Sequence, residues 1–361
     1  MEKKISIRQV MILFFFTAIS GITRLMTPDS KIFLSKSSWI SPFISLLPIL
    51  FLIFILNQII KNNEEKSLSQ IIETIFGKII GKFILFIFLI HVLFFTSFFL
   101  RNFGEKFIFS IFPNVSILFF IIILLLFALF AVRKNIEFFA RFAEFSFIII
   151  SIIFIIAFII ILFNIKPQNL YPVTYYDTAD ILKSSIPLIS LWSLLTFSLF
   201  LGDNINYIGT FKSTATKFLI ITALFNLFAM ISIIGIFNAE TSENIPMPFF
   251  MIFKSIKSTG LIQSFETFFI ILWAFTDFIM ITHFMFIISK IFKTLFATND
   301  KNINLFMIPI AIIILVLSYY IGENIFEIEY FYTNILSYSS IALGYIFPFL
   351  ILFVGKMRKV L

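Results

Sequence analysis

Three residues that could form a polar site fall on one face of an apolar segment in the last third of the chain. Glu266, Trp273 and Asp277 are seven and four residues apart, so at about 100° per residue they lie within ~40° of one another on a helix. Asp277 stands well inside this segment, where an ionisable group costs ~2.5–3.5 kcal/mol on membrane-insertion scales. Trp273 and Asp277 are therefore candidate ligand-binding residues. A structural aspartate, neutral or paired at a helix contact, is the alternative.

The first apolar segment contains a second group of polar or flexible residues. These are Ser20, Gly21, Ile22 and Thr23. Such residues allow a helix to unwind, and unwound backbone presents free amides and carbonyls to a small ligand. We expect these four positions to contact a ligand, with Gly21 marking a break in the helix. Close helix packing at Ser20 and Gly21, with Arg24 extending to the membrane interface, is the alternative.

A third candidate lies in the sixth apolar segment, where polar residues interrupt the apolar run. Trp192, Ser193, Thr196 and Ser198 precede Gly202. This pattern favours a second helix break, with ligand contacts from Trp192, Ser193 and Thr196. The alternative is an unbroken helix, because Ser and Thr hydroxyls also bond to the carbonyl one turn back without breaking a helix.

The sequence carries few residues suited to metal or covalent chemistry. It has no Cys and only two His, His91 and His283, neither with a carboxylate or second His at helical metal spacing such as i+4. No phosphate-binding glycine loop, nucleophile elbow or metalloprotease motif occurs. We therefore expect no enzyme activity, no catalytic residues, no cofactor and no metal, and we expect both histidines to be buried and hydrogen-bonded.

The elements that must position these residues are membrane-spanning helices. Of 361 residues, 60% are hydrophobic and 13% charged, which is more apolar surface than a water-soluble core could bury. The runs are continuously apolar rather than alternating, which favours helices over a barrel. Hydropathy predicts ten spans, at about 10–28, 39–60, 82–103, 115–132, 142–163, 184–202, 217–237, 263–289, 305–321 and 335–355. The predicted fold class is an all-α polytopic membrane protein with a single integral membrane domain, 1–361.

The basic residues indicate how these spans are oriented. Most of the 27 Lys and Arg lie in alternate loops and in the two terminal segments, so by the positive-inside rule both termini face the cytoplasm. The ninth loop fits, since it holds Glu323, Glu327 and Glu329 and no base. The formal charge of +8 is scattered over short loops, so we expect the lipid bilayer as a partner and no nucleic acid.

Short motifs along the chain give it a resemblance to a known family. The stretch 4–9 (KISIRQ) leads into a glycine-containing helix, 101–113 reads RNFGEKFIFSIFP, and 141–144 (RFAE) opens a long apolar helix. The stretch 248–273 and the tail 344–359, which contains GYIFP and KMRK, keep the family's order. The chain resembles the B subunit of the GerA-type nutrient germinant receptor of bacterial spores, in the spore germination branch of the amino acid/polyamine/organocation transporter superfamily.

The resemblance implies a LeuT-like fold of two inverted five-helix repeats, over about 10–163 and 184–355. It also implies a small nutrient germinant, such as an amino acid, bound between spans one, three, six and eight. The partners would be the A and C subunits of the receptor in the spore inner membrane. A secondary amino acid transporter of the same superfamily is the alternative function, because both need an enclosed mid-membrane site.

The charge distribution predicts which loops share a side of the membrane. Accessibility tags in the loop around Lys66 and after Lys359 should label from the cytoplasmic side, and a tag near Glu327 should label from the opposite side. Labelling of Lys66 and Glu327 from the same side would contradict the ten-span arrangement.

Overall fold

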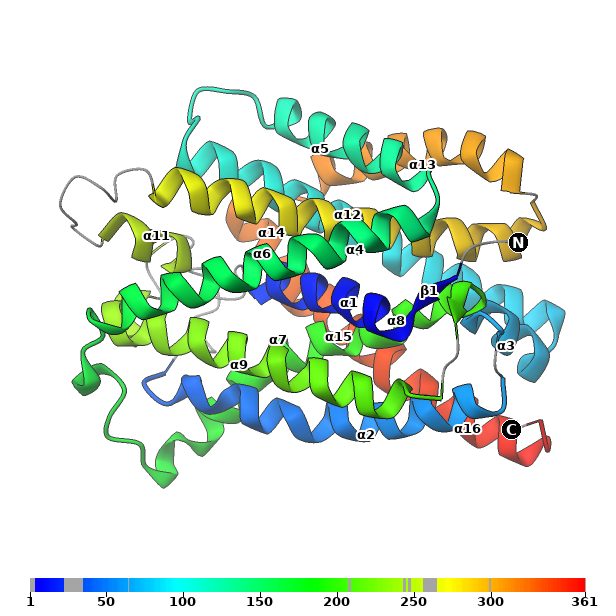
Figure 1. Ribbon diagram of the computed structural model, residues 1–361, viewed down its shortest axis with the longest axis horizontal. Helices are drawn as coiled ribbons and strands as arrows, with labels where there is room; N and C mark the ends of the chain where they lie inside the picture. The colour runs from blue at the N-terminus through cyan, green and yellow to red at the C-terminus, as the bar shows by residue number, and fades with distance from the viewer. Residues whose placement is uncertain are drawn as a thin grey trace.

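The computed structural model describes residues 4–22, 35–63, 65–206, 209–242, 245, 248–255, 265–298 and 300–360. Almost all of these residues are helical, and the long helices lie side by side along one direction (Figure 1). The strands of the described chain are two residues long each, β1 (Ile5–Ser6) and β2 (Ile205–Asn206), and they pair in parallel. The expected all-α fold is confirmed.

The helices alternate with short connections. Those of the first half are α1 (Ile7–Ile22), α2 (Ser41–Lys61), α3 (Leu68–Phe76), α4 (Lys78–Ser110), α5 (Ile117–Val132) and α6 (Ile136–Leu162). Those that follow are α7 (Thr178–Ser193), α8 (Leu195–Ser198), α9 (Phe211–Phe237), α10 (Ala239–Ser242), α11 (Pro248–Ser255), α12 (Phe265–Phe296) and α13 (Asp300–Tyr320). The last apolar segment consists of α14 (Ile325–Phe331), α15 (Ser337–Ile341) and α16 (Phe347–Met357), joined by π-helical turns.

Eight helices of the described chain are long and apolar enough to cross a bilayer. They are Ser38–Lys61, Lys78–Phe109, Ile136–Leu162, Tyr175–Asn204, Phe211–Phe237, Phe269–Phe296, Ile303–Tyr320 and Glu327–Met357. Two further apolar helices, Ile7–Gly21 and Ile117–Val132, are shorter. The polytopic membrane character is thereby confirmed, and these helices coincide in position with the ten predicted spans. The count of ten spanning helices and the inverted repeat stay predictions.

The regular α-helix of the sixth apolar segment is interrupted at Leu194, although Tyr175–Asn204 stays helical along its length. Helix α7 ends at Ser193, Leu194 forms a turn, and the short α8 passes into a 3-10 helix, η5 (Leu199–Asn204). Strand β2 follows directly and pairs with β1, with Ile5 opposite Ile205. The start of α1 is therefore attached to the end of this interrupted segment, although about 200 residues of sequence separate them.

The last apolar segment holds two π-helical turns, η6 (Tyr332–Leu336) and η7 (Ala342–Ile346). Such turns leave backbone groups free for other partners. Ser193 Oγ donates to Ser340 O at 2.9 Å, and Thr196 Oγ1 donates to Gly344 O at 2.7 Å. A side chain on Gly344 would meet the Ser193 carbonyl at 2.6 Å, so the two segments pack backbone against backbone.

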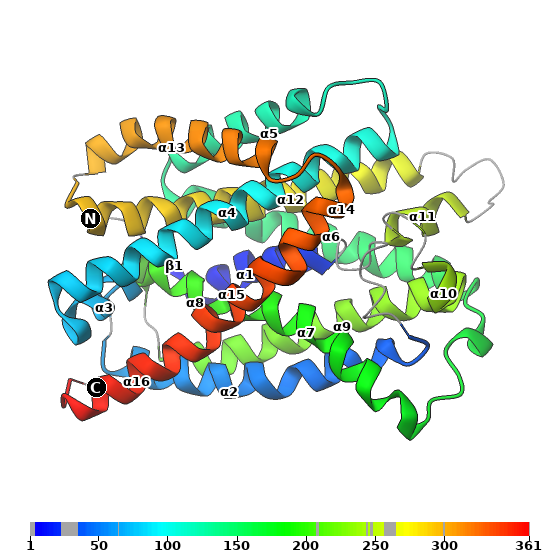
Figure 2. The same cartoon turned by 180° about the vertical axis from the view of Figure 1, so that it is seen from behind.

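Helix α1 lies at the centre of the bundle, in contact with α6, α7, α9 and α12 (Figures 1 and 2). Its phenylalanines fill the core, and Phe15 packs edge-on against Phe147 at 4.9 Å and Phe225 at 5.1 Å between ring centroids. On the outside of the bundle, large apolar side chains such as Phe130 and Phe138 are exposed. Such a surface is stable only against hydrocarbon.

Candidate functional site

A buried polar cluster joins three helices that are far apart in the sequence. Lys106 on α4 reaches Asp277 on α12, with Nζ at 2.8 Å from Oδ2 and 3.1 Å from Oδ1. Ser20 on α1 donates a hydrogen bond from Oγ to Asp277 Oδ1. The side chains of Lys106 and Asp277 are 10% and 2% exposed, and Ser20 is fully buried. The cluster therefore holds a complete ion pair in the interior of the bundle.

Trp273 lies one turn from Asp277 on the same helix and borders the ammonium group. Lys106 Nζ stands 4.7 Å from the centroid of the Trp273 ring. An ammonium group at this distance is attracted to the negative face of an aromatic ring, by about 2 kcal/mol where both are desolvated. Trp273 and Asp277, which helical spacing predicted to lie on one face, therefore both contact the ammonium group of Lys106.

Lys106 is the site residue that the sequence reading missed. The third span was expected to end at 103, which would leave Lys106 in a loop, but α4 continues to Ser110. Lys106 therefore remains on a helix and packs inside the bundle. A signal was present in the motif RNFGEKFIFSIFP, in which Lys106 is followed by more apolar residues.

Two small cavities flank Trp273. One, of about 10 Å³, is bordered by Lys106, Asp277 and apolar neighbours. The other, of about 30 Å³, is lined chiefly by Ile19, Phe154, Phe249, Phe269 and Thr276. Each offers room for about one water molecule. Among the described residues, the polar cluster thus has a small apolar cavity on the other side of Trp273.

The other predicted residues of the first helix are placed differently. A Cβ on Gly21 would lie 2.5 Å from Leu191 Cδ2, so this glycine allows α1 to pack closely on α7. Helix α1 continues to Ile22 without a break in its described part. Thr23 and Arg24 lie outside the described residues. The structure therefore brings Ser20 of this group to the polar cluster.

The predicted residues of the sixth segment are buried beside the last apolar segment. Ser193 and Thr196 donate to carbonyls of Ser340 and Gly344, as described above. Trp192 is fully buried, and its Nε1 has no hydrogen-bond partner among the described residues. None of the three has a described hydrogen bond to Asp277. Contact of these residues with a ligand stays a prediction.

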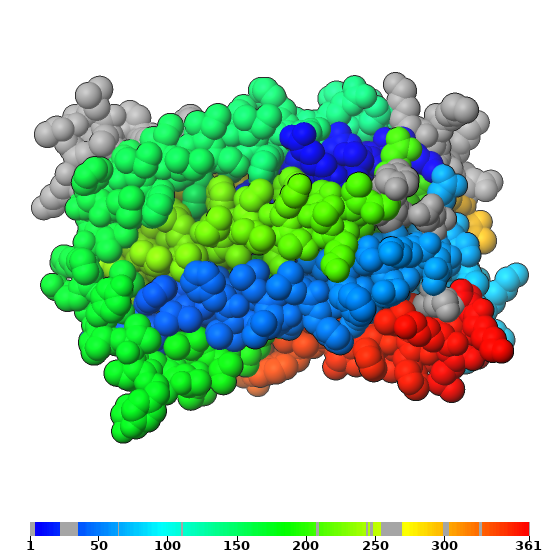
Figure 3. All heavy atoms as spheres, turned by 60° about the horizontal axis from the view of Figure 1, so that its bottom comes forward, coloured from blue at the N-terminus to red at the C-terminus, as the bar shows by residue number. Residues whose placement is uncertain are grey.

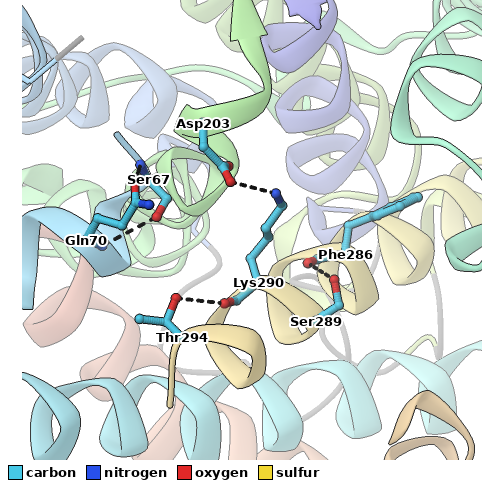
Figure 4. Close-up of polar contacts among 7 residues, drawn as sticks. All are labelled: Ser67, Gln70, Asp203, Phe286, Ser289, Lys290 and Thr294. Carbon is cyan, nitrogen blue, oxygen red and sulfur yellow. Dashed lines mark hydrogen bonds and ion pairs between the residues drawn. The ribbon is translucent and has the colours of Figure 1, made fainter. Parts of the chain in front are cut away.

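Polar contacts continue from the cluster toward the end of the bundle that carries the C-terminus. Thr17 Oγ1 lies 3.5 Å from His283 Nδ1, between α1 and α12. Further along α12, Lys290 Nζ reaches Asp203 Oδ2 of η5 at 2.7 Å, next to Ser67 at the start of α3 (Figure 4). The interrupted sixth segment is therefore attached to the helix that carries Asp277.

Both histidines are buried and hydrogen-bonded, as expected. His91 Nδ1 and Nε2 lie 3.1 and 3.2 Å from the hydroxyls of Ser339 and Ser340. His283 is paired with Thr17 through Nδ1. Groups of three or more His, Cys, Asp or Glu that could hold a metal do not occur among the described residues.

The buried ion pair predicts strong coupling between Lys106 and Asp277 in stability. Lys106→Met or Asp277→Asn alone should cost ~3–5 kcal/mol, because each leaves an unpaired buried charge, whereas the double variant should recover most of the loss. Thermal unfolding in neutral detergent micelles measures this. Arg8→Met is the control: its side chain is 60% exposed and that of its partner Glu144 is 29% exposed, so losing this pair should cost under ~1 kcal/mol. Additive losses at Lys106 and Asp277 would contradict the pairing.

Comparison with known proteins agrees with this architecture. A family model described as "Spore germination protein" matches residues 4–324, which include Ser20, Lys106 and Asp277. Spore germination protein KB of Bacillus subtilis (strain 168) is 23% identical over 333 residues, which cover 91% of this chain and 88% of that protein. The match spans nearly the whole chain, and the resemblance found in the motifs is confirmed. The chain belongs to the spore germination protein family.

Proposed function

We propose that this chain is the B subunit of a nutrient germinant receptor in the spore inner membrane, and that it binds a small germinant at the cluster of Ser20, Lys106, Trp273 and Asp277. Family membership supports the receptor role. The proposed location of the germinant site is supported by the ion pair of Lys106 and Asp277, which is buried where α1, α4 and α12 meet. Ionisable residues inside a membrane are costly and are commonly functional.

The chemistry of the cluster favours an amino acid as the germinant. Lys106 offers a buried ammonium group and Asp277 a buried carboxylate, so each can face an opposite charge on one ligand. A zwitterion would present a carboxylate to Lys106 and an ammonium group to Asp277, replacing one ion pair with two. The apolar cavity beside Trp273 would then receive the side chain of the ligand.

Binding at this cluster would have to change the conformation of the subunit, because the cavities hold only about one water each. A germinant that binds an opened state more tightly than the closed one shifts the population toward it. In the proposed receptor, the A and C subunits would sense that shift. No catalytic step enters this scheme.

We further propose ten spans arranged as a LeuT-like inverted repeat, with both termini in the cytoplasm. The turn at Leu194 supports this arrangement, since it interrupts the first helix of the second half. In such a fold Gly21, Ile22 and Thr23 would lie opposite Trp192, Ser193 and Thr196. The hydroxyls of Ser193 and Thr196 would first have to leave the carbonyls of the last segment.

A secondary amino acid transporter is the second candidate. The same turn at Leu194 favours it, because interrupted helices commonly surround a transported substrate. Uptake of radiolabelled amino acids into proteoliposomes separates the two functions. Saturable binding without uptake supports the receptor, and accumulation of the labelled amino acid inside the vesicles supports the transporter.

The proposed site predicts a specific loss of germinant sensitivity at Asp277. Asp277→Ala should raise the amino acid concentration for half-maximal germination by about 10- to 100-fold, because one charged hydrogen-bond partner of ~1.5–3 kcal/mol is lost. Asp277→Glu should be impaired less. Spores carrying each variant are tested with the protein amino acids added singly, and receptor abundance is measured by immunoblot.

Glu65→Gln is the matched control, since its carboxylate is 75% exposed and pairs with Lys4 at 2.6 Å, away from Asp277. Its dose-response curve should stay within about twofold of the wild-type curve. An unchanged curve for Asp277→Ala at normal abundance would reject the binding role.

A further inference from the structure

Seven basic side chains gather at the end of the bundle that carries the C-terminus. They come from the end of α2, the connections on either side of α3, the start of α4 and the end of α16. We call them the basic rim: Lys61, Lys66, Lys78, Lys82, Lys356, Arg358 and Lys359. All seven are exposed. The sequence scatters them over three stretches, and the fold brings them to one place.

Packing between the helices fixes this convergence. Arg358 Nη1 donates to Ile75 O at 2.6 Å, which attaches the tail to α3. The rings of Phe76 and Phe347 stack at 5.9 Å between centroids, and α16 also packs along α2. Figure 2 shows α3, α16 and the C-terminus at the same end, and Figure 3 shows α2 and α16 side by side on one face.

Three described carboxylates near this end form ion pairs, but none of them with the basic rim. Arg8 pairs with Glu144 and Lys290 with Asp203. Glu65 pairs with Lys4 at 2.6 Å, and this hydrogen bond lowers the pKa of the Glu65 carboxyl. Within the described part of the chain, no residue of the basic rim forms an ion pair. The basic rim therefore presents seven exposed basic groups without a described ion pair, with the Glu73 side chain packed against Gly81 between Lys78 and Lys82.

Large apolar side chains lie directly beside these lysines. At the start of α4, Ile79 and Phe83 are 87% and 66% exposed next to Lys78 and Lys82. At the end of α16, Met357 is 71% exposed between Lys356 and Arg358. A soluble anion would use the lysines alone, whereas a phospholipid would also use the apolar side chains, through its acyl chains.

We propose that the basic rim binds the phosphate headgroup of an anionic phospholipid. Clustered Lys and Arg at the end of a membrane helix attract anionic lipid. The N-terminal end of α4 adds positive potential at the same place. Lys78 is 28 residues from Lys106 on α4, ~42 Å along the helix, so this site is separate from the germinant cluster.

The test is lipid binding by the purified full-length chain in neutral detergent, followed by native mass spectrometry. Phosphatidylglycerol should bind to the wild-type chain more tightly than phosphatidylcholine. Lys78→Gln/Lys82→Gln should weaken phosphatidylglycerol binding by about 10- to 30-fold, and Lys356→Gln/Lys359→Gln should have an effect of the same size. All four side chains are exposed, so the variants should unfold at the wild-type temperature.

The matched control is Lys212→Gln/Lys217→Gln, which removes the same charge from exposed lysines near the start of α9. Its affinity for phosphatidylglycerol should stay within about threefold of wild type. An equal loss of phosphatidylglycerol affinity in the control and in the rim variants would overturn the proposal. The lipid would then be attracted by the overall positive charge of the protein and not by the basic rim. Competition by inorganic phosphate at the concentration of the lipid would also overturn it, because a soluble anion would suffice.

Discussion

The cost of placing a charge in hydrocarbon is the constraint on which the rest of this structure depends. Asp277 lies in the interior of a membrane helix, and it is tolerated there because Lys106 and Ser20 meet it from two other helices. Three helices must therefore stay in register at one point. The continuation of α4 to Ser110 and the burial of α1 at the centre of the bundle both serve that contact.

The same constraint connects the cluster to the interrupted sixth segment. Asp203 in η5 pairs with Lys290 on the helix that carries Asp277, and β2 pairs with β1 at the start of the helix that carries Ser20. A change in the spacing of α1 and α12 at the cluster therefore strains contacts made by η5. These contacts connect the cluster to the end of the bundle that carries the basic rim.

Part of this site could be predicted from the sequence. Trp273 and Asp277 were found because a carboxylate in an apolar helix is costly and helical spacing places both residues on one face. Lys106 was missed because the predicted third span ends at 103, whereas α4 continues to Ser110. Arg101 and Glu105 pair with each other at 2.9 Å, so the helix carries both charges without ending. The all-α membrane fold itself followed from the composition and from the length and continuity of the apolar runs.

Other features depend on neighbours that a sequence does not name. The polar pattern at Ser193 and Thr196 left open a helix break or hydroxyl bonds to the preceding turn, and Ser193 Oγ does donate to Ser190 O at 2.6 Å. Both hydroxyls also bond to carbonyls of the last segment, which no local pattern reveals. Gly21 was compatible with a break in the helix or with close helix packing, and its close approach to Leu191 supports packing. Periodicity predicts which residues share one face of a helix. Which other helix packs against that face depends on the packing of the whole bundle.

The most direct test of the account is equilibrium binding of the active amino acid to the purified Lys106→Met/Asp277→Asn double variant. The account predicts a protein that unfolds near the wild-type temperature, since no charge is left unpaired, but binds the amino acid at least about 100-fold more weakly. Wild-type affinity in this folded double variant would show that the ion pair only holds the helices together, and would contradict the central claim.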